Sequence, residues 1–399
     1  MNKLAPLKLK KGEDRRLHAG HLWVYSNEID TAATPLSGFT AGQQVEIQSA
    51  GGKVLGNGYI NPNTLIAARL VSRNSSYRLD QSLITHRLKV ALSIRERLFP
   101  GPYYRLVHGD SDGLPGLVVD RFGDTLSVQI TTAGMELLRD AVIAALEKVL
   151  KPSVIVLKND TPARLTEGLE QSVECVLGEA PERVALEENG VRFEAPLMSG
   201  QKTGWYYDHR ISRERMQHYV SGLRVLDLFS YIGGWGVQAA VAGAKEVICV
   251  DASEKFLEQV HHNAALNNVT DQVATLHGDA FDALKELRNA KEQFDLIIVD
   301  PPAFIKRKKD QKSGLQGYRR INELAMRLLS RDGILISASC SHHLQRSQLK
   351  SLLLASSRHI DRNLMLLEEG HQGPDHPIHP AIPETEYIKT FFGRVLPNS

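Results

Sequence analysis

Residues 223–236, which read LRVLDLFSYIGGWG, constrain the fold of this chain more than any other stretch. Val225, Leu226 and Leu228 form a short apolar run that is typical of a buried parallel strand. A glycine-rich turn follows, and the next segment, WGVQAAVAGA, has the composition of a helix. Because glycines between a strand and a helix let the backbone approach a ligand closely, the stretch predicts a ligand-binding strand–turn–helix unit.

Two acidic residues indicate that this ligand contains a nucleoside. Asp227 ends the first predicted strand, and a second strand, EVICV, leads directly into Asp251. An acidic side chain about 20 residues beyond a glycine turn is placed to bind a ribose diol. The glycine spacing differs from the dinucleotide pattern GxGxxG, so that motif itself does not match.

Three further buried strands follow, and each ends in polar residues. VATLHGDAFDAL supplies Asp279, where an adenine is expected, FDLIIVDPPAF ends in Asp300, and GILISASCSHHL ends in Cys340. Between strands, the segment SEKFLEQVHHNAALNNV reads as a crossover helix that begins near Ser253. Strands that alternate with helices predict an α/β fold with a doubly wound sheet, in which ligands bind beyond the carboxyl ends of the strands.

Composition excludes several other classes of protein. With 399 residues, 42% of them hydrophobic and 24% charged, the chain is expected to form two or three ordinary soluble domains. No segment approaches the roughly 18 apolar residues of a membrane helix, and the first residues lack a signal-peptide core. Three scattered cysteines favour neither a disulfide framework nor a zinc cluster, so we expect a cytoplasmic protein with reduced thiols and no metal.

The first half of the chain divides into two predicted modules. Residues 1–73 begin with basic residues and continue in short alternating segments, which are typical of a small β-barrel. Trp23 and Tyr25 are candidates for stacking on bases or for the core of that barrel, and the pattern leaves both open. Residues 74–190 predict an α+β module with a hairpin at residues 122–124 and a helix at 135–150, and with no chemistry of its own.

The decapeptide QKTGWYYDHR, residues 201–210, precedes the first strand of the C-terminal half. Helix capping and a solvated helix start would account for Asp208 and Arg210. A plain linker rarely carries so many functional groups, however, and we therefore predict that this segment lines the site, with Tyr207 and Arg210 among its contacts.

The motifs DLFSYIGGWG, CVDAS, GDAF, DPPAF and SCS, in this order, resemble those of the class I S-adenosylmethionine-dependent methyltransferases. The start KKGEDRRLHAGHLWVYSNEI resembles a PUA domain, a small pseudo-barrel that binds RNA. Together with QKTGWYYDHR, the whole chain resembles the RlmI-type bacterial 23S ribosomal RNA large-subunit cytosine-5 methyltransferases. The resemblance implies a PUA domain at 1–73, a small α+β middle domain at 74–190 and a Rossmann-like catalytic domain at 191–399. It also implies S-adenosylmethionine as cofactor and ribosomal RNA of the large subunit as partner, and leaves a homodimer open.

The resemblance also implies which residues form the site. The cofactor is expected to contact Asp227, Phe229, Ser230, Tyr231, Gly233, Asp251, Ala252, Asp279, Ala280 and Asp300, with Tyr207 and Arg210 from the preceding segment. Cys340 corresponds to the nucleophile of the family. The wider group of RNA cytosine-5 enzymes usually carries a second cysteine in the fourth motif, where this chain has Pro302. The group that assists product release is therefore not assigned.

The chemistry supports a cysteine nucleophile independently. Carbon 5 of cytosine is too weak a nucleophile to take a methyl group, and addition of a thiolate at carbon 6 makes it enamine-like. Asp300 is a candidate for the hydrogen bond or proton at N3 that favours this addition. The alternative for Cys340 is a small buried residue at a strand end. Cys249 lies inside a predicted strand and is assigned to the core, and Cys175 has no partner motif.

Basic residues near these motifs are predicted to bind RNA phosphates, although a solvated surface would also explain them. They are Lys306, Arg307, Lys308 and Arg319 after DPPAF, and Lys10, Lys11, Arg15 and Arg16 near the start. The irregular spacing of His371, His376 and His379 favours a loop over a metal site.

Two other functions compete with this interpretation. One is an N-methyltransferase acting on an exocyclic amino group of guanine or adenine, which Asp-Pro-Pro followed by an aromatic residue suggests and which needs no cysteine. The other is a non-catalytic RNA-binding assembly factor, against which the presence of Asp227, Asp251, Asp300 and Cys340 argues.

Overall fold

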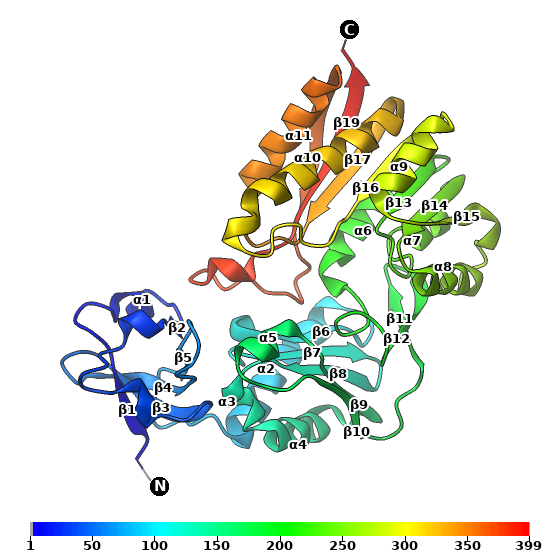
Figure 1. Ribbon diagram of the computed structural model, residues 1–399. Coiled ribbons are helices and arrows are strands. Elements are labelled where there is room, and N and C mark those ends of the chain that lie inside the picture. The colour runs from blue at the N-terminus through cyan, green and yellow to red at the C-terminus, as the bar shows by residue number, and fades with distance from the viewer. Residues whose placement is uncertain (1–2, 399) are drawn as a thin grey trace. The chain divides into compact units, whose positions relative to one another are not determined.

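The computed structural model describes residues 3–398 and contains two compact units (Figure 1). The N-terminal unit comprises Met1–Ala185, Pro196–Tyr207 and Pro374–Thr385. The C-terminal unit comprises Leu186–Ala195, Asp208–Gly373 and Glu386–Ser399. The domain boundaries predicted at residues 73 and 190 stay predictions, and each unit is described by itself.

The N-terminal unit begins with a small β module. Within the described residues, its five strands are ordered β1 (Ala5–Lys8), β3 (Gln43–Gln48), β4 (Val54–Ile60), β5 (Ala68–Ser72) and β2 (Trp23–Val24). The pairing of β1 with β3 is parallel, and the other pairs are antiparallel. Val45 and Ile47 alternate with half-buried polar residues and enter the module's apolar core, to which Leu17 of the short helix α1 (Arg15–His18) also belongs. The alternation predicted a β module of this kind.

The N-terminal unit also contains a second sheet with its own helices. In the described chain its order is β10 (Ser172–Leu177), β9 (Val154–Asn159), β8 (Thr125–Ile130), β7 (Leu117–Phe122) and β6 (Tyr103–His108), and its helices are α2 (Gln81–Leu98), α3 (Ala133–Glu136), α4 (Arg139–Leu150) and α5 (Pro162–Thr166). The predicted hairpin is confirmed, since Phe122 pairs with Thr125. The prediction of one helix over 135–150 is wrong, because Leu138 (φ −110°, ψ 16°) leaves the helical conformation and separates α3 from α4.

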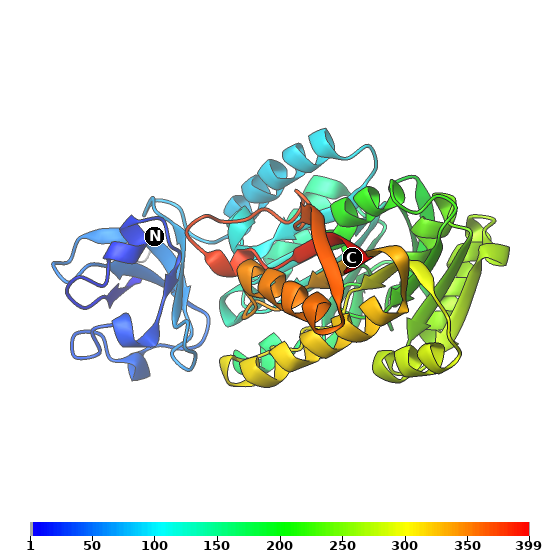
Figure 2. The same cartoon turned by 90° about the horizontal axis from the view of Figure 1, so that it is seen from above.

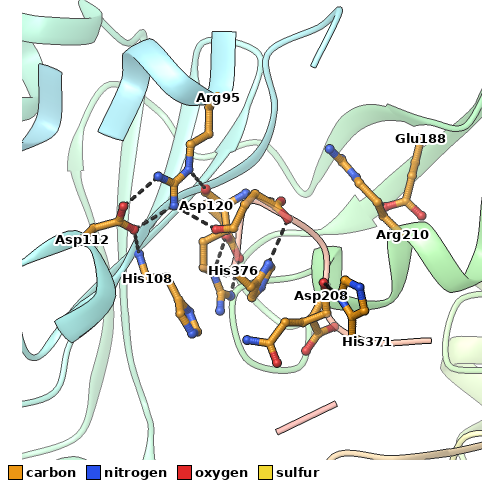
Figure 3. Close-up of polar contacts among 12 residues, drawn as sticks. Arg95, His108, Asp112, Asp120, Glu188, Asp208, Arg210, His371 and His376 are labelled. Carbon is orange, nitrogen blue, oxygen red and sulfur yellow. Dashed lines mark hydrogen bonds and ion pairs between the residues drawn. The ribbon is translucent and has the colours of Figure 1, made fainter. Parts of the chain in front are cut away.

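A late segment of the chain, Pro374–Thr385, belongs to the N-terminal unit and satisfies a buried arginine there (Figure 3). The Arg95 guanidinium, only 1% exposed, donates two hydrogen bonds of 2.7 Å to the Asp112 carboxylate and one of 2.9 Å to the Asp375 carbonyl. The Asp375 carboxylate accepts a bond of 3.0 Å from the Arg105 amide. A buried charge is tolerated only when its hydrogen bonds are made, so these contacts attach the segment to the core of this unit.

The C-terminal unit is a doubly wound sheet, as predicted. Its strands, counted over residues 3–398, run in the order β15 (Val273–His277), β14 (Glu246–Asp251), β13 (Arg224–Leu228), β16 (Phe294–Val299), β17 (Leu329–Ser339), β19 (Lys389–Pro397) and β18 (Arg362–Gly370). The first five are parallel, and β19 is antiparallel to both β17 and β18. The chain reverses its winding between β13 and β16, which creates the switch point at which open α/β sheets bind ligands.

Helices cover both faces of this sheet. They are α6 (Arg210–Gln217), α7 (Gly236–Val241), α8 (Glu254–Leu266), α9 (Ala280–Asn289), α10 (Gln311–Leu328) and α11 (Arg346–His359). Helices α9, α10 and α11 share one apolar core with the sheet, and both views show α10 and α11 side by side (Figures 1 and 2). The hairpin of β11 (Arg183–Glu188) and β12 (Val191–Pro196) adds residues 186–195 to the unit. None of the helices described is both long and apolar enough to cross a membrane.

Candidate active site

Asp227 occupies the carboxyl end of β13 and is completely buried. Its Oδ2 accepts a hydrogen bond of 2.9 Å from the Gly236 amide at the start of α7, while its Oδ1 has no donor among residues 3–398. Burial raises the pKa of this carboxyl well above its usual value, although the Gly236 amide opposes the shift. Glycine is required at 236, because a Cβ there would lie 2.4 Å from the Cys249 Sγ. Cys249 is buried in the core, as predicted.

The loop between β13 and α7 has a strained backbone. Phe229 and Tyr231 adopt positive φ angles of 63° and 51°, and Gly233 has φ 86°. The Ser230 amide donates to the Val250 carbonyl at 3.0 Å, and the buried Ser230 hydroxyl has no partner in the described chain. Left-handed conformations at non-glycine residues are uncommon and concentrate at ligand-binding sites. An unsatisfied buried hydroxyl in such a loop is a group that a ligand can satisfy.

Asp251 attaches this loop to the end of β14. Its two carboxylate oxygens accept hydrogen bonds of 2.9 Å from the Tyr231 and Ser253 amides. Burial raises the pKa of Asp251 despite these bonds, and its side chain stays partly exposed. Ala252 follows on the surface. The exposed Asp279, beyond β15, caps α9 through the Phe281 amide at 2.8 Å, and Ala280 behind it is buried.

Asp300 lies beyond β16 in an ion pair with His209. Its Oδ1 is 3.3 Å from the His209 Nε2, and its Oδ2 accepts a bond of 3.0 Å from the Trp235 indole N–H. Burial favours the neutral form of both ionisable groups. The mutual attraction outweighs it, lowering the pKa of Asp300 and raising the pKa of His209. The attraction therefore favours the charged pair, with the proton on the imidazole. Sequence reasoning missed His209 and Trp235 as partners, although both stand in motifs that it singled out.

The two residues predicted from QKTGWYYDHR lie in different units. Tyr207 is buried in the N-terminal unit, where its hydroxyl donates to the Arg121 carbonyl at 2.9 Å. Arg210, at the start of α6 in the C-terminal unit, lies 3.7 Å from the Glu188 carboxylate (Figure 3). Glu188 also accepts bonds of 2.6 and 3.0 Å from Arg213. A cofactor contact for Tyr207 and Arg210 stays a prediction.

Cys340 follows the last residue of β17 and is half-buried. The serines on either side of it bond to one tyrosine, since the Tyr318 hydroxyl lies 2.8 Å from both the Ser339 and the Ser341 hydroxyl. The Ser341 carbonyl accepts a bond of 2.7 Å from the Lys389 ammonium. This network holds the backbone on both sides of the thiol. None of the three cysteines forms a disulfide.

The predicted RNA-binding residues are mostly exposed. Lys306, Arg307 and Lys308 lie on the surface after β16, and Arg307 pairs with Asp310 at 3.1 Å. Arg319 on α10 pairs with Glu323 at 2.7 Å. In the β module, Lys11 and Arg15 are exposed, Lys10 donates to the Asn27 carbonyl at 2.8 Å, and Arg16 pairs with Glu28 at 2.7 Å. The Trp23 indole donates to Asp110 at 2.9 Å, which ties this half-buried side chain to its own unit.

Comparison with known proteins identifies the class of protein to which this chain belongs. Residues 166–379 match a family model described as S-adenosylmethionine-dependent methyltransferase, and residues 7–73 match a PUA-like domain. A solved protein from Streptococcus mutans superimposes with a TM-score of 0.83 at 21% identity, covering 98% of this chain and all of its own. A second solved structure, of a protein complexed with SAH, gives a TM-score of 0.85 at 22% identity with the same coverage. The chain thus has the fold of an S-adenosylmethionine-dependent methyltransferase with a PUA-like domain.

Whole-length relatives narrow the assignment. A protein from Erwinia tasmaniensis is 36% identical over 396 residues, which cover 97% of this chain and 98% of that one. A protein from Aliivibrio fischeri is 35% identical over 393 residues, with the same coverage. Both are named ribosomal RNA large subunit methyltransferase I, and the chain belongs to their family.

We predict that Asp251 contributes to cofactor binding. Replacing Asp251 by Ala removes charge-assisted hydrogen bonds, each contributing roughly 1.5–3 kcal/mol. Calorimetric titration with S-adenosylmethionine should therefore show an increase in Kd of at least about tenfold. The control is Asp271→Ala, which removes an exposed carboxylate just before β15. Unchanged affinity in a folded Asp251→Ala protein would place the ribose elsewhere.

A second prediction concerns the buried ion pair. The pKa of His209 is raised in the folded protein, so its protonation stabilises the fold fully at pH values below its ordinary pKa of 6.5. This stabilisation is lost as the pH rises through the pKa of His209 in the folded state. The pKa of Asp300 is lowered in the folded protein, so its ionisation stabilises the fold at pH values above its ordinary pKa of 3.8. This stabilisation is lost as the pH falls through the pKa of Asp300 in the folded state. In Asp300→Asn, burial acts on His209 without the carboxylate, so its pKa should fall below 6.5.

NMR titration of ring-labelled histidine measures this shift directly. In the wild-type protein the His209 resonance should titrate with a midpoint above pH 6.5. The control is Asp332→Asn, which removes an exposed carboxylate paired with Arg394, and its His209 should titrate as in the wild type. An identical His209 titration in wild type and Asp300→Asn would show that the pair does not control the imidazole.

Proposed function

We propose that this protein transfers a methyl group from S-adenosylmethionine to carbon 5 of a cytosine in 23S ribosomal RNA, in the cytoplasm, with Cys340 as a covalent nucleophile. The observation that carries the proposal is the position of Cys340 relative to Asp300. They follow β17 and β16, adjacent parallel strands in which Ser337 pairs with Val299. Loops at the carboxyl ends of adjacent strands share one edge of the sheet, which is the ligand edge of this fold. The names of the whole-length relatives support ribosomal RNA as substrate.

The residues at the end of β13 and β14 suit the cofactor. S-adenosylmethionine carries an amino group, a ribose diol and an adenine, and when bound it supplies an electrophilic methyl group. Asp227 offers a buried carboxylate oxygen that has no donor within the described part of the chain, and Ser230 offers a buried hydroxyl; both suit the polar end of the cofactor. We assign the ribose to the partly exposed Asp251 and its neighbour Ala252, and the adenine to the surface at Asp279 and Ala280. We assign the loop from Phe229 to Gly233 to contacts with the cofactor between its polar end and its ribose.

Cys340 and Asp300 are assigned different roles toward the cytosine base. The thiolate of Cys340 adds to carbon 6, which makes carbon 5 nucleophilic, and it leaves again after carbon 5 has lost its proton. Because its pair with His209 keeps Asp300 ionised, this carboxylate accepts a hydrogen bond rather than donating one. It therefore suits a cytosine that is protonated at N3, a form that favours addition at carbon 6.

The RNA is expected to contact Lys306, Arg307, Lys308 and Arg319 of the C-terminal unit, and Lys10, Lys11, Arg15 and Arg16 of the PUA-like module, all of which are exposed except the half-buried Arg16. Of these, Lys306 and Lys308 stand on the surface directly after the Asp300 motif, where phosphates adjoining a flipped-out base would pass.

Replacing Lys306 and Lys308 together by Gln should weaken binding of 23S ribosomal RNA and flatten its salt dependence. Each lost phosphate contact lowers the slope of log Kd against log salt by about 0.7–0.9, so the double variant should lose about 1.4–1.8. Filter binding at a series of salt concentrations measures this slope. The matched control is Lys245→Gln with Lys291→Gln, two exposed lysines at the amino ends of the strands. Equal slopes for both double variants would exclude phosphate binding at 306 and 308.

The covalent mechanism predicts a trapped complex. A 23S ribosomal RNA transcript containing 5-fluorocytidine should form a stable thioether with Cys340 after methyl transfer, because carbon 5 then has no proton to lose. Denaturing electrophoresis and mass spectrometry detect the adduct. Cys340→Ala should abolish both the adduct and turnover on ordinary RNA, yet bind S-adenosylmethionine with nearly unchanged Kd. Cys175→Ala, which removes another half-buried thiol, should retain both.

The result for Cys340→Ala separates the competing functions. Full turnover without an adduct would contradict the cytosine-5 mechanism and favour methylation of an exocyclic amino group. RNA binding without turnover in the wild-type protein, at saturating cofactor, would favour a non-catalytic assembly factor instead.

A further inference from the structure

Lys389 begins β19 and lies beside the Cys340 motif. In the antiparallel pairing of β17 with β19, Lys389 stands directly opposite Ser339, the residue before the thiol. Its ammonium donates to the carbonyl of Ser341, the residue after the thiol, at 2.7 Å. Lys389 thus contacts the backbone on both sides of Cys340. No motif in the sequence pointed to this residue, which lies 49 positions further along the chain.

The lysine is buried, which is rare for an ammonium group. Only 5% of Lys389 is exposed. Lysines are almost never buried to this extent unless a charged or polar group pairs with them. One hydrogen bond to a carbonyl leaves an ammonium with two more protons to place. Burial lowers the pKa of Lys389 to about 8, so the group is still mainly charged at neutral pH.

The charges around Lys389 come from several elements. A negative Cys340 raises the pKa of Lys389, the Arg346 guanidinium on α11 lowers it, and Glu386 raises it. Tyr318 on α10 also interacts electrostatically with the thiol, and the pKa of Tyr318 is raised by burial and by Cys340. Because interaction free energies are reciprocal, a lysine that is favoured by the thiolate must favour the thiolate equally.

We propose that Lys389 is a positioning residue that stabilises Cys340 as a thiolate, ready to attack carbon 6. This inference rests on the proposed function, in which Cys340 is the nucleophile. The Cys340 thiol loses its proton to solvent, and the resulting thiolate is balanced by the Lys389 ammonium. The sulfur lone pair then forms the bond to carbon 6 and returns to sulfur when that bond breaks. Lys389 neither gains nor loses a proton in these steps.

The test measures the thiolate directly and needs neither RNA nor methyl transfer. The rate of alkylation of Cys340 by iodoacetamide is followed from pH 6 to 10 in the full chain, with the Cys340 peptide quantified by mass spectrometry. An opposite charge within about 4–6 Å shifts such a titration by about one to three pH units. Lys389→Met should therefore move the midpoint up by at least about one unit and slow alkylation at pH 7 by about tenfold or more.

Two controls isolate the charge at this position. Lys389→Arg keeps the cation and should retain the low midpoint. Lys350→Met removes an exposed lysine of α11, which is paired with Glu369, and should leave the profile unchanged. A wild-type midpoint in a Lys389→Met protein that still binds S-adenosylmethionine would overturn the proposal.

The remaining outcomes are also decisive. If Lys389→Met does not fold, the midpoint of Cys340 alkylation in the wild-type protein decides. A midpoint at or above the ordinary thiol pKa of about 8.5 overturns the proposal. A lower midpoint that is also found in Lys389→Arg supports it. Failure of this inference is distinct from failure of the proposed function. A Cys340→Ala protein without turnover, together with an unshifted Lys389→Met profile, removes only the role of Lys389.

Discussion

The C-terminal unit depends on the parallel hydrogen-bond ladder that joins β13 to β14 and β16. Its register places Leu228 opposite both Val250 and Val299, so the strands end at the same level. Phe229, Asp251 and Asp300, which follow these three residues, therefore emerge along one edge of the sheet. The next pairing, of Val299 with Ser337, brings Cys340 to the same edge three residues further on. A slip of one residue in any of these strands would separate the groups that this register aligns.

Burial then gives the aligned groups their electrostatic character. Asp227, Asp300 and Lys389 all lie where water does not reach freely, and each makes a hydrogen bond of 2.7–3.0 Å. In such surroundings a charge is costly when alone and interacts strongly with an opposite charge. The pair of Asp300 with His209 stays ionised for this reason. Burial raises the pKa of Asp227, and its Oδ1 has no hydrogen-bond donor among residues 3–398.

The N-terminal unit follows the same physical rule for a structural purpose. Arg95 is buried among Asp112 and Asp375, and these contacts bring the segment Pro374–Thr385 into a unit whose other residues lie more than 160 positions earlier in the chain. Sequence patterns assigned this segment to a Pro-rich loop, because an irregular stretch carries no periodicity from which a partner can be inferred. The break between α3 and α4 escaped prediction for a related reason, since the sequence from Met135 to Leu150 has uninterrupted helical composition.

The sequence by itself predicted the five parallel strands of the C-terminal sheet, the loop that follows Asp227, and the acidic residues and cysteine at the strand ends. It did so because buried parallel strands are continuous apolar runs, and because ligands bind beyond their carboxyl ends, so polar residues there are candidates for the site. The tertiary structure alone decided the partners of those groups. His209 and Trp235 reach Asp300, and Lys389 reaches the backbone beside Cys340, through a register and burial that join distant parts of the chain. Hydrogen bonds between residues far apart leave no local pattern, so only the folded chain reveals them.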